Sequence, residues 1–114
     1  MSRIYKILAR EVWQTALADG VFHGAGVDLA DGYIHFSTGG QAAETARRYF
    51  RDQSGLVVLE VETDDLGEAL RWEPSRGGDL FPHLYGPLFC DCVRAVRDAP
   101  LGADGAPVLG DLAP

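Results

Sequence analysis

The chain has 114 residues, 46% of them hydrophobic and 24% charged, which is ordinary for one globular domain with a single core. Its formal net charge of −7 argues against a general nucleic-acid or anionic-membrane binder. No apolar run is long enough to cross a bilayer, and two cysteines do not make a disulfide framework. We therefore expect a single cytoplasmic domain over residues 1–114 with no membrane partner.

The first part of the chain predicts a strand, a helix and a loop. Residues 3–9 alternate well enough for a strand. Residues 11–20 carry an apolar helical face that includes Trp13, which we place in the core, and they end at Gly20, a natural residue for a helix C-terminus. Residues 21–30 show no clear period and predict a loop.

The stretch from Asp31 to Gln41 is where we expect the site. Asp31-Gly32 predicts a turn, and residues 33–36 are β-formers. Ser37 or Thr38 then caps a helix, with Gln41 in capping-box spacing from Thr38. A strand that ends at a helix N-terminus presents N–H groups to an anionic ligand.

The middle of the chain predicts a helix over 41–51 and then strands. Residues 56–62 are the clearest strand, with a near-continuous apolar run that indicates burial on both faces. Residues 63–67 predict a turn, and 69–73 predict a short strand that Pro74 ends.

The C-terminal part begins with residues 80–87, whose aromatics, prolines and glycine predict a rigid loop beside a pocket. Residues 88–97 resume strand character, which puts Cys90 and Cys92 on one strand face as core cysteines. Two thiols alone cannot complete a zinc site. We expect a hairpin turn, an edge strand and a frayed tail at residues 102–105, 106–109 and 110–114.

The order of elements is β-α-β-α-β and then mostly β, without a glycine-rich nucleotide fingerprint. This favours an α+β fold with two main helices packed against a split or bent, mostly antiparallel sheet.

Three side chains are candidates for catalysis: His35, Glu73 and His83. Two histidines can serve as a base and an acid at neutral pH, although a histidine on a short strand is often structural. Glu73 follows Trp72, and an apolar wall would raise the pKa of that carboxyl; the alternative is an exposed acid at a strand end.

Five further residues are candidates for binding a ligand, because they carry hydroxyl, guanidinium or aromatic groups near the candidate acids and bases: Ser37, Thr38, Arg47, Arg71 and Tyr85. Ser37 and Thr38 have the simpler role of helix caps. Arg47 is either solvated or reaches round to a bound phosphate.

Three blocks carry a family resemblance: residues 31–38 (Asp-Gly-Tyr-Ile-His-Phe-Ser-Thr), 70–73 (Leu-Arg-Trp-Glu) and 81–86 (Phe-Pro-His-Leu-Tyr-Gly). In this order they resemble the bacterial family known as domain of unknown function 952, over about Ile4 to Val96. The resemblance implies an ADP-ribosyltransferase-like fold, a split β-sheet with a cleft that binds NAD in other members of that superfamily.

By this resemblance His35 would bind the nicotinamide-side ribose of NAD, with Ser37 or Thr38 beside it. Glu73 or His83 would polarise the ribose as nicotinamide leaves, and Tyr85 would stack on the nicotinamide. NAD is the expected ligand, with no metal, and the acceptor is not specified.

Three hypotheses remain open. The first is an NAD-dependent ADP-ribosyl transfer enzyme or an NAD-cleaving relative. The second is a metal-independent phosphodiesterase or RNA-end-processing enzyme, which needs the imidazoles of His35 and His83 about 5–7 Å apart across a phosphate. The third is a non-catalytic binding module with a nucleotide-sized pocket; it is favoured if both histidines are buried and fully hydrogen-bonded with no cleft nearby.

Overall fold

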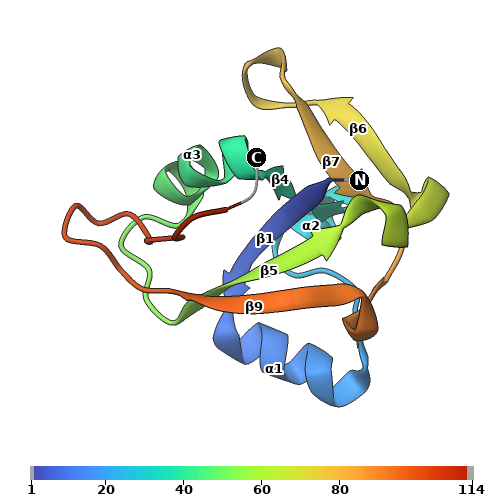
Figure 1. The fold of residues 1–114 in the computed structure, drawn as a ribbon, viewed down its shortest axis with the longest axis horizontal. Helices are drawn as coiled ribbons and strands as arrows, with labels where there is room; N and C mark the ends of the chain where they lie inside the picture. The colour runs from blue at the N-terminus through green and yellow to red at the C-terminus, as the bar shows by residue number, and fades with distance from the viewer. Residues whose placement is uncertain (1, 113–114) are drawn as a thin grey trace.

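The computed structural model describes residues 2–112, which form an α+β fold built on antiparallel sheets (Figure 1). The strands are β1 (Arg3–Ala9), β2 (Val21–Phe22), β3 (Ile34–His35), β4 (Ser37–Thr38), β5 (Leu56–Glu62), β6 (Leu70–Pro74), β7 (Leu80–Leu84), β8 (Leu88–Phe89) and β9 (Val93–Ala99). The α-helices are α1 (Arg10–Asp19), α2 (Val27–Asp31) and α3 (Gly39–Tyr49). Short 3-10 turns lie at 63–65, 67–69, 76–78 and 90–92.

The largest sheet has the strand order β4-β1-β5-β9, and helices cover both of its faces. One face packs against Trp13 of α1 in the main core, and the other packs against Ala42 and Ala46 of α3. Figure 1 shows α1 and α3 on opposite sides of these strands. Burial on both faces explains the continuous apolar run of β5, so the prediction for residues 56–62 is confirmed.

The predicted C-terminus of α1 and the predicted N-terminal cap of α3 are also confirmed, although α3 ends at Tyr49 and not at residue 51. Gly20 follows α1 with a φ of 81°, a left-handed conformation that glycine adopts without a steric cost. Thr38 caps α3: its Oγ1 accepts a hydrogen bond from the Gln41 N–H at 3.2 Å. The Gln41 side chain in turn accepts one from the Thr38 N–H at 3.0 Å, which completes the capping box.

A second sheet, of order β3-β7-β6, contains the resemblance block at 70–73 and parts of the other two. The predicted rigid loop at 80–87 is wrong, because residues 80–84 form the central strand β7 of this sheet. Pro82 is tolerated there because its carbonyl faces β3 and accepts the Phe36 N–H at 3.0 Å, just beyond the last residue of β3. The missing proline donor therefore interrupts no hydrogen bond to β6.

Two other expectations are corrected. Residues 21–30 are not only loop, since they contain β2 and most of α2. Cys90 and Cys92 do not share a strand face; they lie in a 3-10 turn between β8 and β9, and both are partly buried.

The C-terminal segment is packed rather than frayed as far as the structure describes it. The predicted edge strand is only a bridge between Leu101 and Pro107 around the expected turn. Leu109 is buried, and Leu112 packs against the core beneath α3. Residues 113–114 of the expected tail lie outside the described part. Within residues 2–112, no helix is both long and apolar enough to span a membrane.

The close packing of α3 on the sheet yields a stability prediction. Ala46 is buried, so Ala46→Leu forces extra methyl groups into a filled interface and should lower the free energy of unfolding by about 1–3 kcal/mol. Urea denaturation measures this value. Ala43→Leu on the exposed side of the same helix is the matched control and should change stability little. Equal losses in both variants would contradict the packing described for α3.

Candidate functional site

Most of the predicted site residues lie on one face of the three-stranded sheet. His35 of β3 pairs with His83 of β7, which pairs with Arg71 of β6. Residues two apart on a strand share a face, so Glu73 joins this face, while Ile34 of β3 and Leu84 of β7 lie on the opposite face and are buried. The structure thereby brings together residues that are up to 48 positions apart in the sequence, from 35 to 83.

The two imidazoles lie against each other beneath an aromatic ring. Their centroids are 5.5 Å apart in an edge-on arrangement. Tyr33 stacks on His83 at 4.1 Å and lies 4.5 Å from His35 and 5.1 Å from Tyr85. His83 is only 3% exposed. We call Tyr33, His35, Glu73, His83 and Tyr85 the histidine cluster.

Glu73 of β6 binds two members of the histidine cluster, His83 and Tyr85. Its Oε1 accepts hydrogen bonds from His83 Nδ1 at 2.8 Å and from the Tyr85 hydroxyl at 2.7 Å. These bonds, first that of His83 and then that of Tyr85, lower the pKa of Glu73. The expected increase through the neighbouring Trp72 is therefore wrong, because two donors stabilise the carboxylate. The hydrogen bond between the Tyr85 hydroxyl and Glu73 also raises the pKa of Tyr85.

His35 lies between two carboxylates of α2. Its Nδ1 is 2.7 Å from Asp28 Oδ1, and its Nε2 is 3.0 Å from Asp31 Oδ2. The backbone N–H of His35 also donates to Asp28 Oδ1, at 3.0 Å. Both ring nitrogens and the main chain of His35 are thus held by one short helix.

Lys6 of β1 completes this network from the large sheet. Its Nζ lies 3.1 Å from Asp28 Oδ2 and donates to the His35 carbonyl at 3.0 Å. Burial alone would raise the pKa of Asp28, but the hydrogen bonds from His35 and the charge of Lys6 lower it to about 2. Burial lowers the pKa of Lys6, against the effect of Asp28.

Sequence reasoning missed the residues that surround the two histidines: Lys6, Asp28, Asp31 and Tyr33. One signal was available. Lys6 shares its strand face with Ile4 and Leu8, both of which are buried, and a lysine on an apolar face requires a buried acid. The position of that acid was hidden because α2 has only five residues between glycine-rich flanks.

Three other predicted residues form contacts away from the histidine cluster. Ser37 Oγ is 3.1 Å from Thr45 Oγ1, and Thr38 caps α3. Arg47 is exposed on α3 and forms an ion pair with Glu44.

Arg71 does approach the histidine cluster. Its guanidinium carbon lies 4.8 Å from the centre of the Tyr85 ring, a cation–π distance. Of the predicted ligand-binding residues, Arg71 therefore places a cation beside the predicted acids and bases.

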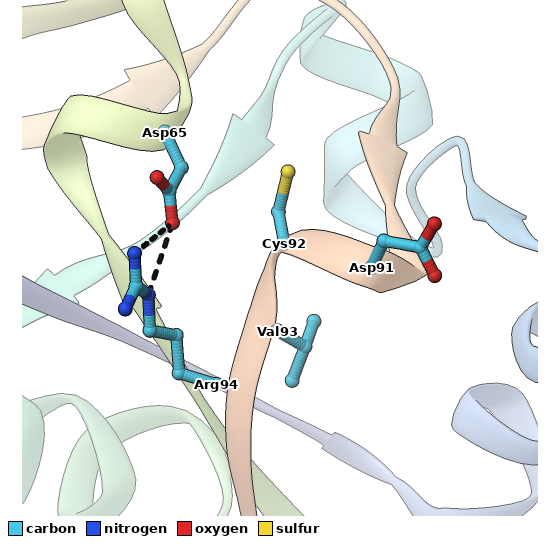
Figure 2. A pocket seen from close by; sticks show the side chains of 5 residues that line it. All are labelled: Asp65, Asp91, Cys92, Val93 and Arg94. Atoms are coloured by element: carbon cyan, nitrogen blue, oxygen red, sulfur yellow. Dashed lines mark hydrogen bonds and ion pairs between the residues drawn. The ribbon is translucent and has the colours of Figure 1, made fainter.

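Hollows in the described part of the chain lie beside the histidine cluster and away from it. An open hollow of about 290 Å³ is lined by Asp28, Tyr33, Ile34 and Leu84, among others; it adjoins the histidine cluster through Tyr33 and not through His35, Glu73, His83 or Tyr85. An open hollow of about 550 Å³ is lined by Asp65, Asp91, Cys92, Val93 and Arg94, none of them a predicted site residue (Figure 2). There Arg94 donates two hydrogen bonds to Asp65 Oδ2, at 3.0 and 2.9 Å. Residues 2–112 contain no group of three His, Cys, Asp or Glu side chains able to hold a metal ion.

A family model and solved structures match this chain. A family model described as "Protein of unknown function (DUF952)" matches residues 7–96. The crystal structure of Protein CC0527 from Caulobacter crescentus is 56% identical, with a TM-score of 0.94 over 96% of each chain. Its solution NMR structure gives 57% identity and a TM-score of 0.87, over 97% of this chain and 96% of that chain. The comparison with curated proteins gave no match.

The buried Asp28 carboxylate predicts a specific loss of stability in acid. The pKa of Asp28 is about 2, below the ordinary value of 3.8. At pH values above 3.8, the ionised carboxylate therefore adds about 2 kcal/mol to the free energy of unfolding. This contribution falls as the pH drops from 3.8 toward 2. Asp28→Asn should remove this part of the pH dependence and also destabilise the protein at neutral pH, since Lys6 loses its buried partner.

Urea denaturation at a series of acidic pH values measures this effect. Asp98→Asn, which removes the exposed partner of Arg10, is the matched control and should keep the wild-type pH slope. The same acid slope in wild type and Asp28→Asn would show that Asp28 is not the ionised buried group described.

Proposed function

The chain belongs to the DUF952 family, and we propose that it binds NAD at the histidine cluster and cleaves the bond between nicotinamide and ribose. We also propose that the two main sheets form the split sheet of an ADP-ribosyltransferase-like fold. The observation that supports this function most is an ionised carboxylate, Glu73, held by His83 and Tyr85 within an aromatic cluster.

The charge and shape of the site suit the nicotinamide end of NAD. NAD supplies a cationic heterocycle whose departure leaves positive charge on the ribose. Glu73 is ionised, and Asp28 and Asp31 add negative charge beside His35. Fixed charges placed where opposite charge develops stabilise a transition state. Tyr33 and Tyr85 offer ring faces on which a planar cation can stack.

The remaining residues have separate tasks in this proposal. His35 forms hydrogen bonds with ribose hydroxyls, and its polar contacts to α2 keep it oriented for that role. Arg71 is exposed beside Tyr85 and binds the diphosphate. The open hollow at Tyr33 has about 290 Å³, which is too small for a whole dinucleotide, so in this proposal most of NAD lies on the surface beside the histidine cluster. The hydroxyls of Ser37 and Thr38 and the Arg47 guanidinium are engaged by other residues, so the proposal does not use them.

A two-histidine phosphodiesterase is less well supported, although the 5.5 Å between the imidazole centroids falls in the range that it needs. Three carboxylates, those of Asp28, Asp31 and Glu73, contact the two rings. Their negative charge would repel a phosphate placed between the histidines.

A binding module without turnover is the second candidate. His83 is buried and both nitrogens of His35 have partners, but the His35 side chain is 28% exposed, so the condition that both histidines are buried is not met. The condition of no cleft nearby is also not met, because the open hollow adjoins Tyr33.

The proposal predicts that NAD binds and that nicotinamide is released. Glu73→Gln keeps the shape of the side chain and removes its charge, so it should slow nicotinamide release by about 100-fold while changing NAD affinity little. His35→Ala should abolish binding. Calorimetric titration and thermal shift measure binding, and a nicotinamide-release assay measures turnover. Glu11→Gln, an exposed acid on α1, is the matched control and should behave like wild type.

The outcomes separate the candidates. Binding of NAD without release of nicotinamide would favour the binding module. Absence of any thermal shift with NAD, ADP-ribose or nicotinamide would contradict the proposed ligand, and phosphorylated RNA ends and cyclic phosphates would then be tested.

A further inference from the structure

Lys6 is a buried cation that no step of the proposed function uses. We propose that Lys6 is a positioning residue: through Asp28 it fixes the neutral tautomer of His35 with the proton on Nδ1. Nε2 is then the nitrogen that gains and loses a proton. The value of this arrangement for catalysis rests on the proposed function, but the tautomer itself is a property of the free protein.

The contacts of Lys6 converge on His35 from two directions. Lys6 Nζ donates to the His35 carbonyl at 3.0 Å and lies 3.3 and 3.1 Å from the two oxygens of Asp28. Asp28 binds both the backbone N–H and Nδ1 of His35. One ammonium group therefore fixes the main chain of His35 and also the carboxylate that contacts its ring.

The charge of Lys6 sets the direction of the hydrogen bond at Nδ1. Asp28 is 3% exposed, and its oxygens also accept the N–H groups of His35 and Ala25. A carboxylate that faces an ammonium group and these donors only accepts hydrogen bonds. Nδ1 must then be the donor. Without the ammonium group, Asp28 would be a buried charge with less compensation and would take up a proton more readily.

The other side of the ring is open to exchange. Nε2 faces Asp31 Oδ2 at 3.0 Å, and the Asp31 side chain is 43% exposed. The remaining titratable groups that face this ring are Tyr33, at 4.5 Å between centroids, and His83 of β7, at 5.5 Å. When Nε2 carries a proton it donates that proton to the Asp31 carboxylate, and loss of the proton to solvent leaves the neutral ring with its proton on Nδ1.

Nitrogen-15 NMR of the histidine side chains tests the assignment directly. A pH series of these spectra first identifies the range in which the His35 ring is neutral, and in that range wild-type His35 should show a protonated Nδ1 and an unprotonated Nε2. A predominant Nε2–H tautomer in wild type would overturn the proposal. This spectrum is recorded without NAD, so it stands or fails independently of the proposed function.

Variants test the part that Lys6 plays. Lys6→Met keeps an unbranched apolar chain and should give a mixture of the two tautomers, whereas Arg10→Met, which removes an exposed ion pair with Asp98, should leave the His35 signals unchanged. If Lys6→Met does not fold, Asp28→Asn takes its place and should also lose the single tautomer. A pure Nδ1–H tautomer in the folded variant would overturn the role of Lys6.

Discussion

The buried ion pair of Lys6 and Asp28 joins the two main sheets at the point where the candidate site lies. Lys6 belongs to the large sheet, Asp28 to α2, and His35, which both of them bind, to the three-stranded sheet. Burying two charges is unfavourable unless they are paired and hydrogen-bonded, and here five hydrogen bonds to Lys6 or Asp28 provide that compensation. The position of His35 therefore depends on a contact between segments that are distant in the sequence.

The two faces of the three-stranded sheet have different roles: one packs in the core, and the other carries the histidine cluster. Ile34 and Leu84 turn inward and belong to the main core. The histidines alternate with them and lie on the opposite face, where carboxylates and tyrosines surround them and leave His83 buried. Because the sheet face that carries the site is rigidly backed by the core, the relative positions of the two imidazoles are set by strand register rather than by flexible loops.

Local sequence patterns were enough to predict much of the secondary structure, but they did not predict the contacts between segments that are distant in the sequence. Periodicity identified β1, β5, α1 and α3, and the spacing of Thr38 and Gln41 identified the cap of α3. The sequence also gave the candidate acids and bases, but not their partners. The predicted increase in the pKa of Glu73 was wrong because the two hydrogen-bond donors that lower it, His83 of β7 and Tyr85 just after β7, are distant in the sequence. The central strand β7 was not predicted because it contains Pro82, and α2 was not predicted because five residues are too few for a helical periodicity to appear.

The most direct test of the account is to locate bound NAD by NMR, following backbone amide shifts of the isotopically labelled protein during a titration. The account predicts that the largest changes occur at His35, Arg71, Glu73, His83 and Tyr85, which come together on one sheet face. Changes confined to the hollow around Asp65 and Cys92, or no changes at all, would contradict it.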